Sequence, residues 1–362
     1  MSRLGKITIK KIAVPLLIFT LGTAGILPGA LLIFRLYSNE YWTNIYPELV
    51  RMDSNVLDQM IYEVEHEYYG VYSIIIIRNG FIVKEWYDSF ANKDFLFRLY
   101  SVSKSVTSAL IGIAIDKGYI SSLDELVLDY FPDRDIANLD PQKESMTIEH
   151  LLTMTTGLHW PEYYPYDDPR NPYNDWKASE DHVEFVLNRT MVSPPGQTFN
   201  YNTGATHLLT AILQRATSMS TIDFANKYLF RPLKIQHINW LLDPQGVACG
   251  GDGLYLRTRD MAKIGYLFLK GGKWDGKQII SETWVRTSTS QLISLGLNIG
   301  YGYQWWVYPL DRCFRALGYG GQQINVFYQN NLLVIFTGMN LSYDFASFLI
   351  NNYILPSIIG ST

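Results

Sequence analysis

Two residues at the start of a predicted helix, Ser101 and Lys104, form a pair that can perform nucleophilic chemistry. A serine hydroxyl is a weak nucleophile until a neighbouring base removes its proton. Residues three apart lie on one face of a helix, so the Lys104 amine can reach the Ser101 oxygen. Burial disfavours the ammonium and makes lysine a usable base. The pair predicts an acyl-enzyme on Ser101, whereas a helix-capping serine beside a solvated lysine is the ordinary alternative.

The segment that carries this pair, residues 101–117, is apolar around most of the helix circumference. A helix of this kind is normally buried, and Gly118 ends it as a plausible residue after the C-cap. A solvated lysine would be poorly accommodated there, which favours the catalytic interpretation of Lys104. Placing Ser101 at the helix N terminus also offers free backbone N–H groups to a developing oxyanion.

Two further segments offer groups that acyl transfer needs. Residues 199–204 read FNYNTG, and a tyrosine such as Tyr201 can relay a proton to the leaving group. Residues 317–322 read LGYGGQ at the start of an apolar strand, where glycines let a substrate approach the backbone. The N–H group of Gln322 can supply a second oxyanion donor. Taken alone, each segment has a structural alternative, a packed core tyrosine and a glycine-rich turn.

The order of the three segments resembles the serine β-lactamase and penicillin-binding protein superfamily. The resemblance spans about residues 70–340 and is closest to β-lactamase-related esterases and hydrolases of the 6-aminohexanoate-dimer type. Further matching stretches lie at residues 123–132, 147–157, 253–265 and 301–306. The resemblance implies a β-lactamase/transpeptidase-like fold and, as catalytic residues, Ser101, Lys104 and Tyr201. For the oxyanion and the substrate it implies Ser101, Thr203, Tyr319, Gly320, Gly321 and Gln322.

Two positions depart from the penicillin-recognising members of this superfamily. Those members usually have the motif Tyr-x-Asn, and here its third position is Thr203. Their final motif usually begins with Lys or His, and here Tyr319 stands at that position. A cation that would pair with a substrate carboxylate is therefore missing from that position. The expected activity is hydrolysis of a small ester or amide. A β-lactamase or D-alanyl-D-alanine carboxypeptidase is one alternative, and a membrane-tethered sensor or binding protein without turnover is the other.

Hydrophobic periods and turn signals predict the elements that position these residues. Residues 72–77 and 81–87 read as two strands joined by the type I′ turn pair Asn79-Gly80. Strands at both ends of the chain and helices between them predict an α+β fold, an antiparallel sheet flanked by helices with a mostly helical second lobe. Further helices are expected at residues 56–67, 148–155, 180–187, 206–216, 258–269, 281–287 and 343–354. Further strands are expected at residues 304–308, 314–317, 323–328 and 332–337.

Composition excludes several function classes. The chain of 362 residues has a net charge of -4, which leaves no basic footprint for nucleic acid. The six histidines include no H-x-x-x-H pair, and no Cys/His cluster has zinc-ligand spacing, so neither a metal nor a cofactor is expected. The two cysteines, Cys249 and Cys313, are expected to be free thiols, with a single disulfide as the alternative.

The N-terminal region predicts a membrane anchor. Residues 12–34 form an uncharged run of 23 residues, long enough to cross a bilayer core of roughly 30 Å. Basic residues before it place residues 1–11 in the cytoplasm and the catalytic region on the extracytoplasmic side. A cleaved signal peptide is the alternative. Residues 35–70 then form a connector, and residues 71–362 form the hydrolase domain.

Overall fold

The computed structural model describes residues 42–67, 70–339 and 341–360. Among these residues no helix is long and apolar enough to cross a membrane. The predicted anchor at residues 12–34 lies outside the described residues, so it stays a prediction.

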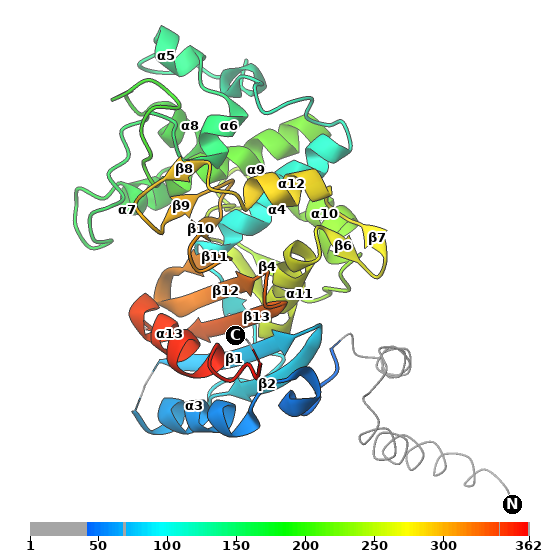
Figure 1. The fold of residues 1–362 in the computed structure, drawn as a ribbon. Coiled ribbons are helices and arrows are strands. Elements are labelled where there is room, and N and C mark those ends of the chain that lie inside the picture. Colours follow the sequence, from blue (N-terminus) through cyan, green and yellow to red (C-terminus); the bar gives the residue numbers. More distant parts are fainter. Residues whose placement is uncertain (1–41, 68–69, 340, 361–362) are drawn as a thin grey trace, which may run out of the picture.

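An eight-stranded antiparallel sheet runs through the molecule, with β12, β13, β1 and β2 in the lower half of Figure 1 and β10, β9 and β8 beside the helices above them. The strand order is β2-β1-β13-β12-β11-β10-β9-β8. Strands from the two ends of the described chain are therefore neighbours, with Ile75 opposite Ile335. The strands are β1 Val71–Arg78, β2 Phe81–Tyr87, β8 Ile293–Ser294, β9 Gly300–Tyr301, β10 Trp306–Tyr308, β11 Cys313–Gly318, β12 Gln322–Phe327 and β13 Leu332–Gly338.

The first hairpin has the predicted turn, because Asn79 and Gly80 both adopt positive φ, 52° and 86°. The isoleucines of β1 alternate between the two faces of the sheet, and both faces are buried. Ile74 and Ile76 belong to a core cluster with apolar residues of α3 and α13, while Ile75 and Ile77 belong to the main core. This double burial explains why the strand is a continuous apolar run rather than an alternating one.

Helices cover both faces of the sheet. The helices α3 Ser54–Glu67 and α13 Tyr343–Leu349, the latter continued by a π-turn at Ile350–Ile354, lie together on one face (Figure 1). The helices α11 Thr258–Leu269 and α4 Val102–Asp116 contribute to the main core on the other face. The helix predicted within the 35–70 connector is thus confirmed as α3, and it packs onto the sheet of the hydrolase domain.

The middle of the chain forms the helical lobe at the top of Figure 1. Its longest helix is α9 Thr203–Thr217, which packs beside α4. The predicted helices are confirmed with small shifts at their ends. The shorter helices are α5 Pro141–Glu144, α6 Ile148–Leu152, α7 Tyr173–Ala178, α8 His182–Leu187, α10 Thr221–Ala225 and α12 Glu282–Ser288. The prediction missed α5, α7 and α10, because helices of four to six residues give no clear helical period.

Short strands were also missed, since two or three residues carry no period of two. The strands β3 Phe97–Arg98, β5 Leu254–Leu256 and β4 Asn239–Trp240 form a three-stranded sheet in that order. The strands β6 Lys273–Trp274 and β7 Lys277–Gln278 pair as a separate hairpin.

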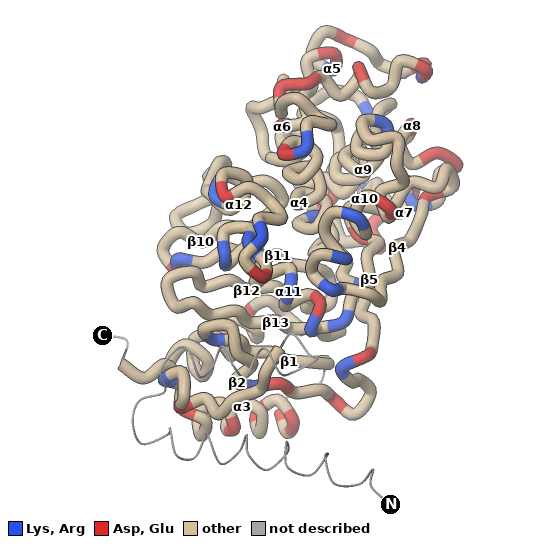
Figure 2. The backbone as a smooth tube through the Cα atoms, turned by 90° about the vertical axis from the view of Figure 1, so that its right-hand side faces the viewer, with Lys and Arg blue, Asp and Glu red and all other residues tan. Residues whose placement is uncertain are grey.

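The charged residues are mixed in sign over the surface shown in Figure 2, and the two cysteines are not bonded to each other. Figure 2 shows Lys and Arg interspersed with Asp and Glu over both lobes, so neither sign forms an extended stripe on the face shown. Cys249 and Cys313 are both buried free thiols, as expected, and the disulfide alternative is wrong.

Candidate active site

Ser101 lies at the junction between β3 and α4, immediately before the first helical residue. The preceding residue, Tyr100, has a φ of 48°, a left-handed conformation that is rare for a bulky side chain. Backbone strain of this kind persists only where the surrounding structure enforces it, and it concentrates at functional sites. The amide N–H of Ser101 donates to no backbone carbonyl in the described part of the chain. It is therefore free to donate to a ligand.

The Lys104 amine makes three hydrogen bonds inside the protein, although the side chain is only 1% exposed. Its Nζ atom lies 3.0 Å from Ser101 Oγ, 2.9 Å from Thr203 Oγ1 and 2.9 Å from the Gly251 carbonyl oxygen. The first contact is the one that the helical spacing predicted. The other two join α4 to α9 and to the loop before β5.

Burial lowers the pKa of Lys104 from its ordinary value to about 8. Desolvation is the largest cause, because the ammonium loses its water on entering the core. The nearby carboxylates of Glu162 and Asp252 act in the opposite direction and favour the charged form. A substantial fraction of neutral amine therefore exists near neutral pH, which the proton acceptor of a hydroxyl nucleophile requires.

Thr203, the first residue of α9, connects Lys104 to a buried carboxylate. Its hydroxyl donates to Glu162 Oε1 over 2.5 Å, so the same oxygen is oriented to accept from Lys104. Glu162 also accepts from the Thr203 amide and from the indole N–H of Trp160, each over 2.7 Å. The Thr203 hydroxyl is thus engaged on both sides and orients Lys104. That Thr203 also contacts the substrate stays a prediction.

Tyr201 lies beside this pair, as the resemblance implied. Its ring is stacked on Trp306 with centroids 5.9 Å apart, and Lys104 Nζ lies 4.8 Å from its centroid. Burial and the Glu162 charge raise the pKa of the Tyr201 phenol, and a hydrogen bond with Ser101 only partly offsets them. The phenol is therefore protonated across the physiological range, which suits it to donate a proton rather than to act as the first base.

The predicted glycine-rich segment forms the tight turn between β11 and β12. Gly320 and Gly321 adopt φ of 78° and 102°, which side-chain-bearing residues rarely adopt. A Cβ atom on Gly318 would lie 2.3 Å from the Leu99 carbonyl oxygen, so the turn packs directly against the segment that leads to Ser101. The Gln322 side chain braces the turn through its amide nitrogen, 2.6 Å from the Gly338 oxygen.

A cavity of about 250 Å³ opens above Ser101. Tyr319, which is 52% exposed, lines it and packs edge-on against Tyr100 and Tyr166 with centroids 5.4 and 5.8 Å apart. Four of the lining side chains are tyrosines. The lining residues are Arg98, Tyr100, Ser101, Tyr166, Tyr173, Thr203, Asp252 and Tyr319.

The cavity contains a cation that sequence reasoning missed. Arg98 forms an ion pair with the buried Asp252, 2.7 Å from its carboxylate, and its guanidinium lies 4.6 Å from the centre of the Tyr100 ring. Tyr173 donates a further hydrogen bond to the same carboxylate oxygen. Because Arg98 and Asp252 neutralise each other, the cavity wall offers no unpaired positive charge at this point.

The structure thus brings Ser101, Lys104, Tyr201 and Thr203 into direct contact, and it places Tyr319 in the same cavity. Gly320, Gly321 and Gln322 follow Tyr319 in the adjoining turn. Sequence reasoning missed Glu162, Asp252 and Arg98 because their partners lie 41 to 154 residues away along the chain. The one available signal was the glycine run at residues 250–253, which indicates a close backbone approach.

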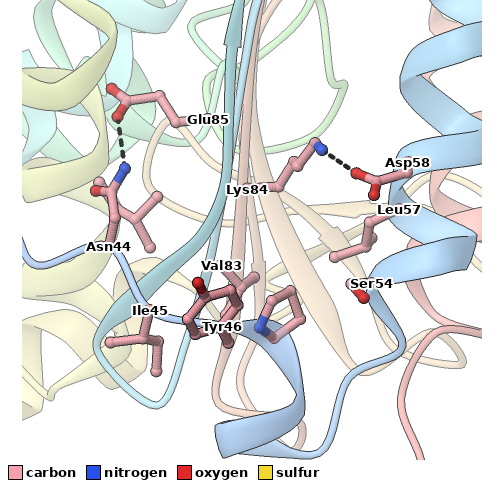
Figure 3. Close-up of a pocket in the computed structure, with 11 residues that line it drawn as sticks. Asn44, Ile45, Tyr46, Ser54, Leu57, Asp58, Val83, Lys84 and Glu85 are labelled. Atoms are coloured by element: carbon pink, nitrogen blue, oxygen red, sulfur yellow. Dashed lines mark hydrogen bonds and ion pairs between the residues drawn. The ribbon is translucent and has the colours of Figure 1, made fainter. Parts of the chain in front are cut away.

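A larger hollow of about 590 Å³ lies at the other end of the molecule, between β2 and α3 (Figure 3). Lys84 of β2 pairs there with Asp58 of α3, and Asn44 donates to Glu85 over 3.4 Å. Neither Ser101 nor Lys104 lines this hollow, so its volume alone does not make it the catalytic site.

Comparison with known proteins agrees with this geometry. Residues 52–351 match the model of the protein family described as Beta-lactamase. The 6-aminohexanoate-dimer hydrolase of Paenarthrobacter ureafaciens is 23% identical over 275 residues, which cover 70% of this chain and 68% of that protein.

Solved structures share the fold. A putative 6-aminohexanoate-dimer hydrolase from Bacillus anthracis superposes with a TM-score of 0.70 at 22% identity, covering 84% of this chain and 81% of its own. EstCE1, described as a hydrolase with promiscuous acyltransferase activity, gives a TM-score of 0.68 at 18% identity, covering 85% and 97%. At these identities the likeness establishes the fold and leaves the substrate to be argued from the site.

The lowered pKa of Lys104 generates a prediction about the reactivity of Ser101. Neutral Lys104 accumulates as the pH rises through its pKa, so the rate of Ser101 labelling by a fluorophosphonate should rise with an apparent pKa of about 8. Well below that pH the rate should change about tenfold per pH unit, because one proton must leave the base. Labelling reactions quenched at a series of times and analysed by mass spectrometry measure this rate. Lys104→Ala should remove the pH dependence, and a profile that the substitution does not alter would contradict the assignment.

Proposed function

Because the chain belongs to the β-lactamase family, we propose that it is a serine hydrolase that cleaves a small ester or amide through an acyl-enzyme on Ser101. The observation that carries the proposal is the orientation of the Lys104 amine. Thr203 Oγ1, which donates its own hydrogen to Glu162, and the Gly251 carbonyl can only accept from Lys104. In the neutral amine these two contacts hold both hydrogens, and the lone pair faces Ser101 Oγ at 3.0 Å.

The first chemical step follows from this arrangement. Lys104 takes the Ser101 proton while Oγ attacks the substrate carbonyl carbon, and the negative charge moves to the carbonyl oxygen. The backbone N–H groups of Ser101 and Gln322 are proposed to stabilise that oxyanion, since both belong to segments that meet at Gly318. Glu162, positioned through Thr203, favours the ammonium that Lys104 becomes during the step.

The second step returns the proton to the leaving group. The Tyr201 phenol, protonated and within hydrogen-bonding reach of Ser101, donates to the departing oxygen or nitrogen and regains a proton from Lys104. Water then attacks the acyl-enzyme with the same groups acting in reverse. Turnover distinguishes this function from a sensor, which would keep the acyl group on Ser101.

The lining of the cavity favours an uncharged or weakly polar substrate. Tyrosine rings supply flat apolar contacts with hydroxyl groups at their edges. The one cation in the wall, Arg98, is paired with Asp252, and Tyr319 occupies the position where penicillin-recognising relatives carry a cation. Short esters are therefore favoured over penicillins, whose carboxylate would find no unpaired positive charge.

We also propose, from residues 12–34, that the hydrolase is anchored in a membrane with its catalytic region on the extracytoplasmic side. The support comes from the charge pattern of the N terminus, where four basic residues precede the uncharged run and one follows it.

Substitution of Ser101 tests the proposed function. Ser101→Ala should abolish fluorophosphonate labelling and lower turnover of p-nitrophenyl butyrate by more than about 1,000-fold, because the other hydroxyl beside Lys104 among the described residues, that of Thr203, donates its hydrogen to Glu162. Ser108→Ala is the matched control, since Ser108 is a buried serine of the same helix whose hydroxyl has no hydrogen-bond partner among the described residues. In the unsubstituted protein, benzylpenicillin should be the poorer substrate. Full labelling of Ser101→Ala would refute the assignment of the nucleophile. Faster hydrolysis of benzylpenicillin than of the ester would refute the substrate preference.

The relay role of Tyr201 predicts a dependence on the leaving group. Tyr201→Phe should slow amides and alkyl esters by about 100- to 10,000-fold, the usual effect of losing a general acid. Activated p-nitrophenyl esters should be affected much less, because p-nitrophenolate leaves without protonation. Steady-state kcat/KM for matched amide and ester pairs measures the difference. Tyr301→Phe, a neighbouring buried tyrosine, serves as the control. Equal losses for both substrate types would exclude the relay.

The anchor predicts a specific fractionation behaviour. The full chain should stay in the membrane pellet after alkaline carbonate extraction, because an uncharged span of 23 residues partitions into the bilayer core. A variant without residues 1–35 should appear in the supernatant with unchanged esterase activity. Protease added to intact cells or spheroplasts should digest the catalytic region of the full chain. Release of uncleaved full chain by carbonate would contradict the anchor.

A further inference from the structure

Three ionisable side chains meet in the helical lobe, outside the catalytic cavity. His182 begins α8, His207 lies within α9, and Asp243 follows β4. All three are buried, and one potential ligand atom from each lies within 4.8 Å of the others. Trp176 packs against both imidazole rings, with centroids 5.0 Å and 5.6 Å away. The proposed chemistry on Ser101 uses none of these groups.

The hydrogen bonds of the two histidines leave one nitrogen of each without a partner. His207 Nε2 lies 2.9 Å from Asp243 Oδ2, and His182 Nε2 lies 3.3 Å from the Lys177 carbonyl oxygen. An ionised carboxylate and a carbonyl can only accept, so each Nε2 carries the hydrogen. In a neutral imidazole the other nitrogen, Nδ1, then holds a lone pair. Both Nδ1 atoms are buried and have no hydrogen-bond partner in the described part of the chain.

Two buried lone pairs without a donor are costly to leave unsatisfied, and their surroundings match those of metal-binding histidines. Histidines that bind a metal through one nitrogen almost always donate the other N–H to a carboxylate or a backbone carbonyl. Asp243 and the Lys177 carbonyl stand in those places. The single negative charge of Asp243 would also partly neutralise a divalent ion at this depth.

We propose that the Nδ1 atoms of His182 and His207 bind a structural first-row divalent metal ion of the zinc class, with Asp243 as the outer carboxylate that orients His207. Imidazole nitrogen is a ligand that such ions accept, at a distance of about 2.0–2.1 Å. Two ligands of one tetrahedral ion lie about 3.4 Å apart. The centroids of the two imidazole rings are 5.6 Å apart, so small rotations of the side chains bring both Nδ1 atoms to one ion. Water completes the coordination.

The position of the site indicates what the ion would stabilise. Asp243 Oδ1 accepts from the backbone N–H groups of Gln245 and Val247, over 2.9 Å and 2.8 Å, which shapes the loop that follows. That loop continues to Gly251, whose carbonyl holds Lys104, and to Asp252 in the cavity wall. An ion on the two histidines would join α8 to α9 and, through the His207–Asp243 hydrogen bond, to this loop, and so stabilise the wall of the catalytic cavity.

Metal binding can be measured on the full, tag-free chain purified in detergent and stripped with a chelator. After addition of Zn²⁺ and removal of the excess, mass spectrometry of the metal content should find about one ion per chain. Co²⁺ should give the visible absorption bands of a low-symmetry site with nitrogen and oxygen ligands. The melting temperature should rise with Zn²⁺ concentration, because an ion that binds only the folded state stabilises it by mass action.

Two variants and a control make the test specific. His182→Ala and His207→Gln should each lose the bound ion, the cobalt bands and the zinc-dependent rise in melting temperature. His237→Ala, which removes an exposed histidine, should keep all three. If His207→Gln does not fold, His182→Ala decides alone, because among the described residues the imidazole of His182 makes a single hydrogen bond, with the Lys177 carbonyl. Metal content that stays at one ion per chain in His182→Ala, or wild-type protein that retains no ion, would overturn the proposal.

Discussion

The rest of the site depends on the three hydrogen bonds of the buried Lys104 amine. The amine donates them to Ser101 one helical turn earlier, to Thr203 at the start of α9 and to the Gly251 carbonyl. To satisfy them, two helices and a loop must approach one another closely. Gly251 makes this possible, because a Cβ atom there would lie 2.7 Å from both the Thr203 carbonyl oxygen and its methyl carbon. The amine is thus both the proposed base and the point at which α4, α9 and the loop before β5 meet.

Opposing electrostatic effects set the protonation state of this amine. Desolvation lowers the pKa of Lys104, and the charges of Glu162 and Asp252 keep it from falling further than about 8. Of the two charges, that of Glu162 has the larger effect. The carboxylate of Asp252 also accepts hydrogen bonds from Arg98 and Tyr173. Glu162 is held by four hydrogen bonds, two of them from Thr203. A base with a pKa near the working pH combines adequate neutral fraction with adequate basicity, which is the balance that general base catalysis favours.

The sequence was sufficient to predict an element or a contact wherever the residues involved are close together along the chain. The period of 3.6 located α4 and α9, the Asn79-Gly80 pair located the first hairpin, and the spacing of three placed Lys104 on Ser101. Tyr201 and Tyr319 came from the resemblance alone, since nothing local distinguishes them from packed aromatics. Glu162 and Asp252 could not be predicted, because their roles arise from contacts between distant segments. The contacts of Thr203 with Glu162 and Lys104 were missed for the same reason, as its hydroxyl meets them only in the folded chain.

The residues proposed for catalysis and the residues that line the substrate cavity lie in different kinds of structural element. Ser101, Lys104 and Thr203 lie at the starts of two long buried helices, where packing fixes their positions. The tyrosines of the cavity wall come instead from connecting segments, from the first residue of the short helix α7 and from a tight turn. Tyr166 lies in the loop before α7, and Tyr319 in the turn between β11 and β12. Loops tolerate substitution better than buried helices do. Changes in the tyrosine wall can therefore alter which acyl groups fit while the Lys104 hydrogen bonds, and with them the pKa of the base, stay in place.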